Sequence, residues 1–149
     1  MDTRETSQLV MDALAHAVSG NADGAATALQ TIGQQSNGSE MYGVCCALAA
    51  AGVQALRSIY GDRAPQSGSA GMWVLEQLKP GALDGDPAGA FAMRFLIAYA
   101  NRDSANCLAL YDAAWKASDD EFVESVSALL AEVAGITRLA LDQQKGENR

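Results

Sequence analysis

The chain has 149 residues, of which 49% are hydrophobic and 19% charged, so it can close one hydrophobic core and is neither disordered nor fibrous. Eighteen acidic residues against ten basic ones give a net charge of −8 at pH 7. Such a surface repels phosphate backbones and anionic lipid, which argues against nucleic-acid and membrane partners.

Capping and breaking signals divide the first part of the chain into three predicted helices. Their expected ranges are 3–18, 22–35 and, after a break at 36–38, a third helix to about Tyr60. Asn37 and Glu40 form a predicted capping box, in which each side chain bonds the other residue's backbone N–H. The most apolar run, 41–56, is too short for a membrane span and is rich in small residues, so we interpret it as a buried helix.

A stretch rich in Gly, Ser and Pro follows, and we predict a connector over 61–85 with one short helix at 70–78. Asp86 followed by Pro87 is a strong helix start, because Pro at the first helical position needs no N–H donor. Three more helices are expected over about 87–100, 104–117 and 119–143, the last after a second capping box of Ser118 and Glu121. The tail, 144–149, is predicted to fray.

These elements predict a single all-α domain, 1–149, of about seven helices, because no stretch alternates with period two and Ala and Leu are abundant. The segments 3–60 and 86–143 match at an offset of roughly 80 residues. Asn21-Ala22-Asp23 matches Asn101-Arg102-Asp103, and Glu40 matches Glu121. We interpret this as an internal duplication: two stacked three-helix units, each burying the apolar face of the other.

Small residues in the third predicted helix support close packing between the units. A glycine inside a helix costs about 0.5–1 kcal/mol relative to alanine, so its presence suggests that close helix contact offsets the cost. The small residues are Gly43, Ala47, Ala50, Ala51 and Gly52.

The segment from Gly20 to Leu29, after a helix ending at Val18, resembles a tetratricopeptide-type helical hairpin, and the segment from Asn101 to Leu110 resembles it again. The repeat here is much longer than the family's repeat of about 34 residues, and the signature Trp, Tyr and Pro positions are missing. The resemblance implies a surface that binds a protein or a peptide on a concave face.

The only histidine, His16, shares one face of the first helix with Asp12 and Ser19. A hydroxyl one turn away on the same helix is poorly placed to attack a substrate bound by the imidazole, so we expect an exposed polar stripe rather than a triad. One histidine and scattered carboxylates give no zinc site. We therefore expect no catalytic residues, no metal and no cofactor.

The three cysteines, Cys45, Cys46 and Cys107, form no CxxC pair, and the N-terminus is polar without a secretory signal, which favours a reducing cytoplasm. A reactive thiol needs a nearby cation or a helix N-terminus. Cys107, in the first turn of its helix with Arg102 nearby, meets this requirement best. We nevertheless expect all three to pack as small apolar side chains.

Four residues are predicted to bind a partner: Tyr42, Trp73, Arg94 and Arg102. Large amphipathic aromatic side chains anchor partners when they are exposed. Arg94 stands among apolar neighbours, where it either reaches outward to water or enters a groove as a ligand-binding cation.

The sequence favours a non-catalytic protein or peptide interaction module with an adaptor, chaperone-like or regulatory role, which could also self-associate through a leftover apolar stripe. A first alternative is a small-ligand-binding helical domain with a pocket between the two units, near Trp73, Arg94 and His16. A second is an enzyme that uses His16 or Cys107. An acidic mimic of nucleic acid would need its carboxylates gathered on one face, whereas the sequence spreads them over every segment.

Overall fold

The structure, a computed structural model, describes residues 3–61 and 85–147, and these contain helices and no strand. The all-α class is therefore confirmed for the described residues. The predicted short helix at 70–78, Trp73 and most of the connector lie outside them. The described helices are α1 (Thr3–Val18), α2 (Ala22–Gln35), α3 (Gly38–Tyr60), α4 (Pro87–Ala100), α5 (Ser104–Lys116) and α6 (Asp119–Glu147).

Five of these helices begin with the same N-cap hydrogen bond. The side-chain oxygen of the residue before the helix accepts a hydrogen bond, 2.9 to 3.2 Å long, from the backbone N–H three residues on. The predicted capping box before α3 is complete, because Asn37 N–H also donates to Glu40 Oε1 at 3.0 Å. The capping residues are Asn21, Asn37, Asp86, Asp103 and Ser118.

The predicted fraying of 144–149 is wrong for most of the tail, since α6 continues to Glu147. The segment 143–145 consists of Gln, Gln and Lys, which are good helix formers, and nothing there breaks the helix. Gln143 Nε2 also donates a hydrogen bond to the carbonyl oxygen of Ile59 at 3.3 Å, which ties this end of α6 to the end of α3.

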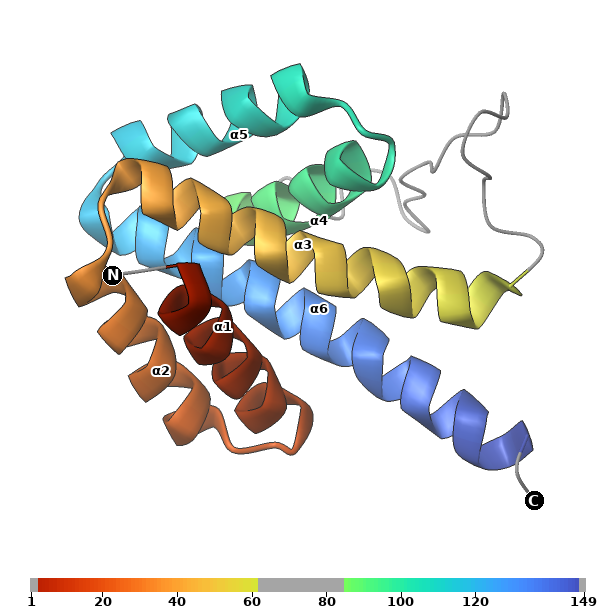
Figure 1. The fold of residues 1–149 in the computed structure, drawn as a ribbon. Coiled ribbons are helices and arrows are strands. Elements are labelled where there is room, and N and C mark those ends of the chain that lie inside the picture. Colours follow the sequence, from red (N-terminus) through yellow and green to blue (C-terminus); the bar gives the residue numbers. More distant parts are fainter. Residues whose placement is uncertain (1–2, 62–84, 148–149) are drawn as a thin grey trace.

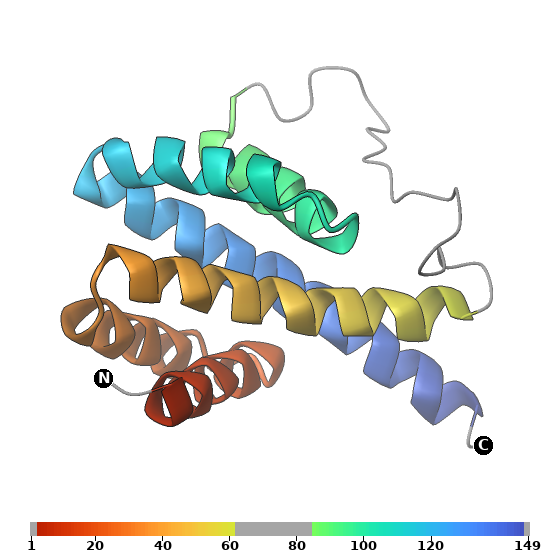
Figure 2. The same ribbon diagram turned by 45° about the horizontal axis from the view of Figure 1, so that its top comes forward.

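The two long helices, α3 and α6, lie side by side and run in the same direction (Figure 1). The α1–α2 hairpin covers one side of this pair and the α4–α5 hairpin the other (Figure 2). Helix α1 packs on α6 as well as on α3, and α4 packs on both long helices. The two halves of the chain therefore share one core. A solenoid needs successive hairpins packed on each other, whereas α3 and α6 separate these two hairpins.

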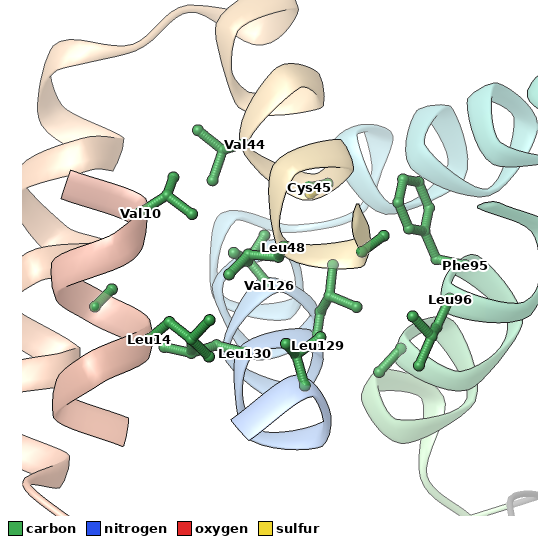
Figure 3. Close-up of a cluster of buried hydrophobic side chains, with 14 of the residues drawn as sticks. Val10, Leu14, Val44, Cys45, Leu48, Phe95, Leu96, Val126, Leu129 and Leu130 are labelled. Carbon is green, nitrogen blue, oxygen red and sulfur yellow. The ribbon is translucent and has the colours of Figure 1, made fainter. Parts of the chain in front are cut away.

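The shared core is apolar and closely packed (Figure 3). Side chains of α3 and α6 fill its centre, with α1 residues on one side and α4 residues on the other. Gly52 of α3 marks a close approach between helices: a Cβ built there would lie 2.9 Å from Leu96 Cδ1 and 3.1 Å from Val133 Cγ2. The expected role of small residues therefore holds at Gly52, whereas a Cβ at Gly43 would meet nothing within 4 Å.

The α1–α2 and α4–α5 turns have the same hydrogen-bonded geometry, a Schellman motif. Gly20 (φ 86°) and Arg102 (φ 60°) hold the left-handed position, which costs a residue with a side chain about 1–2 kcal/mol. In each turn the next residue, Asn21 or Asp103, caps the following helix. The bonds are Gly20 N–H to Ala17 O, Asn21 N–H to His16 O, Arg102 N–H to Tyr99 O and Asp103 N–H to Ala98 O.

The predicted alignment of the two turns is therefore wrong by two residues. It matched Asn21 with Asn101, whereas the structural counterpart of Asn21 is Asp103, and that of Gly20 is Arg102. The two Asn-x-Asp sequences look alike but have different roles, because Asn21 caps the start of α2 whereas Asn101 caps the end of α4. Short–short–long helix order in both halves has the form that a duplication would give, and the duplication stays a prediction.

Helix α3 has 23 residues with a mean hydropathy of 1.3 over its most apolar window, and it is the described helix long and apolar enough to cross a membrane. It extends beyond the predicted apolar run at both ends. In this structure its apolar face is used for packing: Val44, Cys45, Leu48 and Ala49 are fully buried against the neighbouring helices.

Candidate functional site

Two hollows on the described surface bring together residues from both halves of the chain. One, the polar pocket, lies between α3 and the α4–α5 turn and has a volume of about 460 Å³. Two of the predicted binding residues, Tyr42 and Arg102, line it. Arg94 lines an adjoining hollow that shares Arg102, so three of the four predicted residues lie near one another. The fourth, Trp73, lies outside the described residues.

The second hollow, the apolar groove, lies between α2 and the corner where α5 meets α6 and measures about 580 Å³. Trp115 and Val123 stand at the groove with 46% and 61% of their surfaces exposed. The hydroxyl oxygen of Ser36, also in the lining, is buried and has no hydrogen-bond partner among the described residues. The apolar side chains that define this groove are Leu29, Met41, Trp115, Phe122, Val123 and Val126.

Aromatic contacts connect the two hollows. Tyr42 of the polar pocket meets Tyr111 with ring centroids 5.2 Å apart, and Tyr111 stacks on Trp115 at 6.0 Å. Trp115 in turn meets Phe122 edge-on at 5.0 Å. Tyr111 Oη donates a 2.6 Å hydrogen bond to the carbonyl oxygen of Gly38, so α5 is held against the first turn of α3. Tyr42 of the polar pocket and Trp115 of the apolar groove therefore both pack on Tyr111, whose position the hydrogen bond to Gly38 fixes.

The apolar groove was not predicted from the sequence. The four predicted binding residues include Trp73 but not Trp115, which lines this groove. The available signal was Val123, an apolar residue beside Phe122 and between acidic residues at the start of α6. A single helix can direct only one of two adjacent side chains fully inward, so one of this pair had to be more exposed.

The thiols of the polar pocket are poor nucleophiles. Burial raises the pKa of Cys107 to about 11, with smaller contributions from Cys46 and Asp103. Burial likewise raises the pKa of Cys45, outside the pocket, to about 12, and that of Cys46 above its ordinary value. Since the thiolate is the reactive form, this environment opposes the enzyme alternative that uses Cys107.

Thiol titration tests these environments. In a Cys46→Ala variant, we expect Cys45 and Cys107 to react with an aromatic disulfide reagent at pH 8 at least about tenfold more slowly in the folded protein than in urea. A raised folded-state pKa also means that the unfolded state releases its protons first. The free energy of unfolding should therefore fall as pH rises from about 8.5 toward 11. Equal reaction rates in both states would contradict the burial argument.

His16, Asp12 and Ser19 form hydrogen-bond contacts with residues close to them in the sequence. His16 Nδ1 lies 3.1 Å from Asn21 Nδ2, and Ser19 Oγ donates to the carbonyl oxygen of His16. Asp12 Oδ1 accepts a hydrogen bond from Gln8 rather than orienting the imidazole. These contacts secure the end of α1 and the cap of α2, which is a structural use. Among the described residues, no group of three or more His, Cys, Asp or Glu side chains could hold a metal ion.

Comparisons of the chain with protein-family models, with curated proteins and with solved structures found no match.

Proposed function

We propose that this protein is a non-catalytic interaction module whose apolar groove binds an amphipathic helix of a partner protein. The groove itself carries the proposal: it is concave, its volume is within the range of ligand sites, and its lining is mainly apolar. Trp is enriched among residues that dominate binding energy, and Trp115 is half exposed here although its ring is held by Tyr111 and Phe122.

The charge around the groove specifies the partner's chemistry. Asp119 lines the groove, and Asp120 and Glu121 follow it in the first turn of α6. The whole chain carries a net charge of −8. A complementary helix therefore has an apolar stripe at i, i+3, i+4 and i+7 with Lys or Arg beside it. The unpartnered hydroxyl of Ser36 supports occupancy, because a bound backbone or side chain can satisfy it.

The rigidity of the groove supports a binding role. Gly38 lies under the indole of Trp115, where a built Cβ would be 3.3 Å from Trp115 Cζ2. The Tyr111 bond to Gly38 holds the same place. Pre-ordered walls lose little side-chain entropy on binding, which favours affinity. All three cysteines are free thiols, which supports the proposal that the module works in a reducing cytoplasm.

The test uses the full chain and a fluorescent synthetic peptide of roughly 18 residues, with Leu on one helical face and Lys on its flanks. We expect saturable binding by fluorescence anisotropy, and Val123→Gln should weaken it at least about tenfold because it places an amide in the apolar groove. Leu139→Gln is the matched control: Leu139 is on the same helix, is 63% exposed and lies outside the groove, so its affinity should stay within about twofold.

A second peptide, with Glu in place of every Lys, tests the charge argument. It should bind at least about tenfold more weakly than the Lys peptide at low salt, and the difference should shrink as salt is added. Equal losses in Val123→Gln and Leu139→Gln would contradict the groove as the site. Equal affinity for the two peptides would contradict the proposed basic partner.

A further inference from the structure

We propose that the polar pocket is a second, independent binding site, which takes a small organic anion: a carboxylate or phosphate group on an apolar body. The pocket lies where α3 faces the end of α4 and the start of α5, so both halves of the chain build it. It is separate from the apolar groove, and the proposal does not depend on the interaction module.

Positive charge gathers here although the chain as a whole is acidic. Arg57 and Arg102 line the pocket, and Arg94 lines the adjoining hollow beside Arg102. Three of the ten basic residues of the chain thus line the polar pocket or the hollow beside it. The one carboxylate in the described lining belongs to Asp103, and its Oδ1 accepts the Asn106 N–H as a helix cap. Guanidinium groups suit carboxylate and phosphate oxygens, because their planar N–H donors can bond two oxygens at once.

Arg102 occupies its position against the preference of the backbone. Its φ of 60° is in the left-handed region, and the equivalent turn of the first half has Gly20 at that place. Strained residues of this kind gather at functional sites, where the side chain has a use that glycine cannot supply. The only described non-glycine residue with positive φ is thus an arginine that lines a pocket together with a second arginine.

The rest of the lining fits an apolar body. Tyr42, Tyr99, Ala50 and Val53 supply apolar walls, and the volume of about 460 Å³ suits a ligand of metabolite size. Burial raises the pKa of Tyr42 to about 12, and its hydroxyl interacts with the Cys46 thiol, so Tyr42 stays neutral and contributes its ring to the wall of the pocket. The geometry therefore favours an amphipathic anion with its charged end toward Arg102, which the pocket shares with the adjoining hollow of Arg94.

Nitrogen-15 NMR titration of the full chain tests this site with phenyl phosphate, phenylacetate and the neutral benzyl alcohol. We expect saturable shifts of the Tyr42, Tyr99 and Ser104 amides with at least one of the two anions, and no saturable shift with benzyl alcohol. The variant Arg102→Gly removes the guanidinium while giving the turn its favoured residue, so the fold is retained. It should bind the anion at least about tenfold more weakly.

Lys145→Gln is the control, because it removes one positive charge from the exposed end of α6 and should change the affinity less than about twofold. Thermal unfolding of Arg102→Gly at or above the wild-type midpoint confirms that lost binding is not lost folding. The proposal is overturned if neither anion binds, if Arg102→Gly binds as tightly as wild type, or if the shifts map elsewhere. None of these results would affect the apolar groove, whose peptide assay is separate.

Discussion

Phe95→Ala is expected to lower the free energy of unfolding by about 3–5 kcal/mol, the range for truncating a buried aromatic side chain. Phe95 is 0% exposed and lies where α4 meets α3 (Figure 3). Its ring contacts Phe91 with centroids 5.5 Å apart and Tyr42 at 6.4 Å. The surrounding helices cannot close the cavity without moving the shared core. Urea unfolding followed by circular dichroism measures the change.

The matched control is Leu108→Ala on α5, whose side chain is 48% exposed and whose loss should change stability by less than about 0.5 kcal/mol. Domains of this size are stabilised by only about 5–15 kcal/mol, so Phe95→Ala could unfold the chain outright. Phe95→Leu keeps most of the volume and should cost roughly 1–2 kcal/mol, which remains measurable. A loss below about 1 kcal/mol in Phe95→Ala would mean that α4 is not part of the shared core.

Local signals in the sequence were sufficient to predict where the described helices begin. The predicted range 22–35 agrees with α2, and the predicted starts at Asp86 and Ser118 agree with the observed caps. Each cap depends on a bond between residues three apart, and the sequence displays such short spacings directly. The end of α6 was predicted too early: the helix-forming residues at 143–145 were a local signal for continuation, and the bond from Gln143 to Ile59, 84 positions earlier, adds a tertiary contact that local spacing does not show.

The arrangement of the helices depends on contacts that sequence spacing does not show. Arg138 of α6 donates a 2.8 Å bond to the carbonyl oxygen of Ala17 at the end of α1, 121 residues away. The stripe of apolar residues on α1 could equally have packed on α3 alone. The parallel placement of α3 and α6, with α1 across both, is decided by the total burial of all the stripes together, which no single helix encodes.

The candidate sites likewise depend partly on residue type and partly on the fold. Residue type alone predicted that Arg102 and Tyr42 bind a partner, and the fold places them in one pocket. That the first half has Gly20 where the second has Arg102 became visible only through the hydrogen bonds of the two turns. The apolar groove needed the fold as well, because α2 and the start of α6 are distant in sequence and supply its two walls.

The variant Gly52→Ala should lower the free energy of unfolding by roughly 1–2 kcal/mol, although alanine is the better helix former. The new methyl group would lie 2.9 Å from Leu96 Cδ1 and 3.1 Å from Val133 Cγ2, closer than carbon atoms pack. Leu96 and Val133 are 1% and 0% exposed, so neither can move aside freely. Overpacking at this contact of α3, α4 and α6 outweighs the gain in helix propensity. Chemical unfolding measures the difference.

Gly43→Ala, in the same helix, should change the free energy of unfolding in the opposite direction. A Cβ at Gly43 meets nothing within 4 Å, and the residue is exposed, so the helix propensity gain of about 0.5–1 kcal/mol should appear as added stability. Gly43→Ala and Gly52→Ala make the same substitution nine residues apart. Comparing their free energies of unfolding therefore separates the effect of helix propensity from the effect of packing. If Gly52→Ala were as stabilising as Gly43→Ala, the three helices would not approach as closely as the shared core requires.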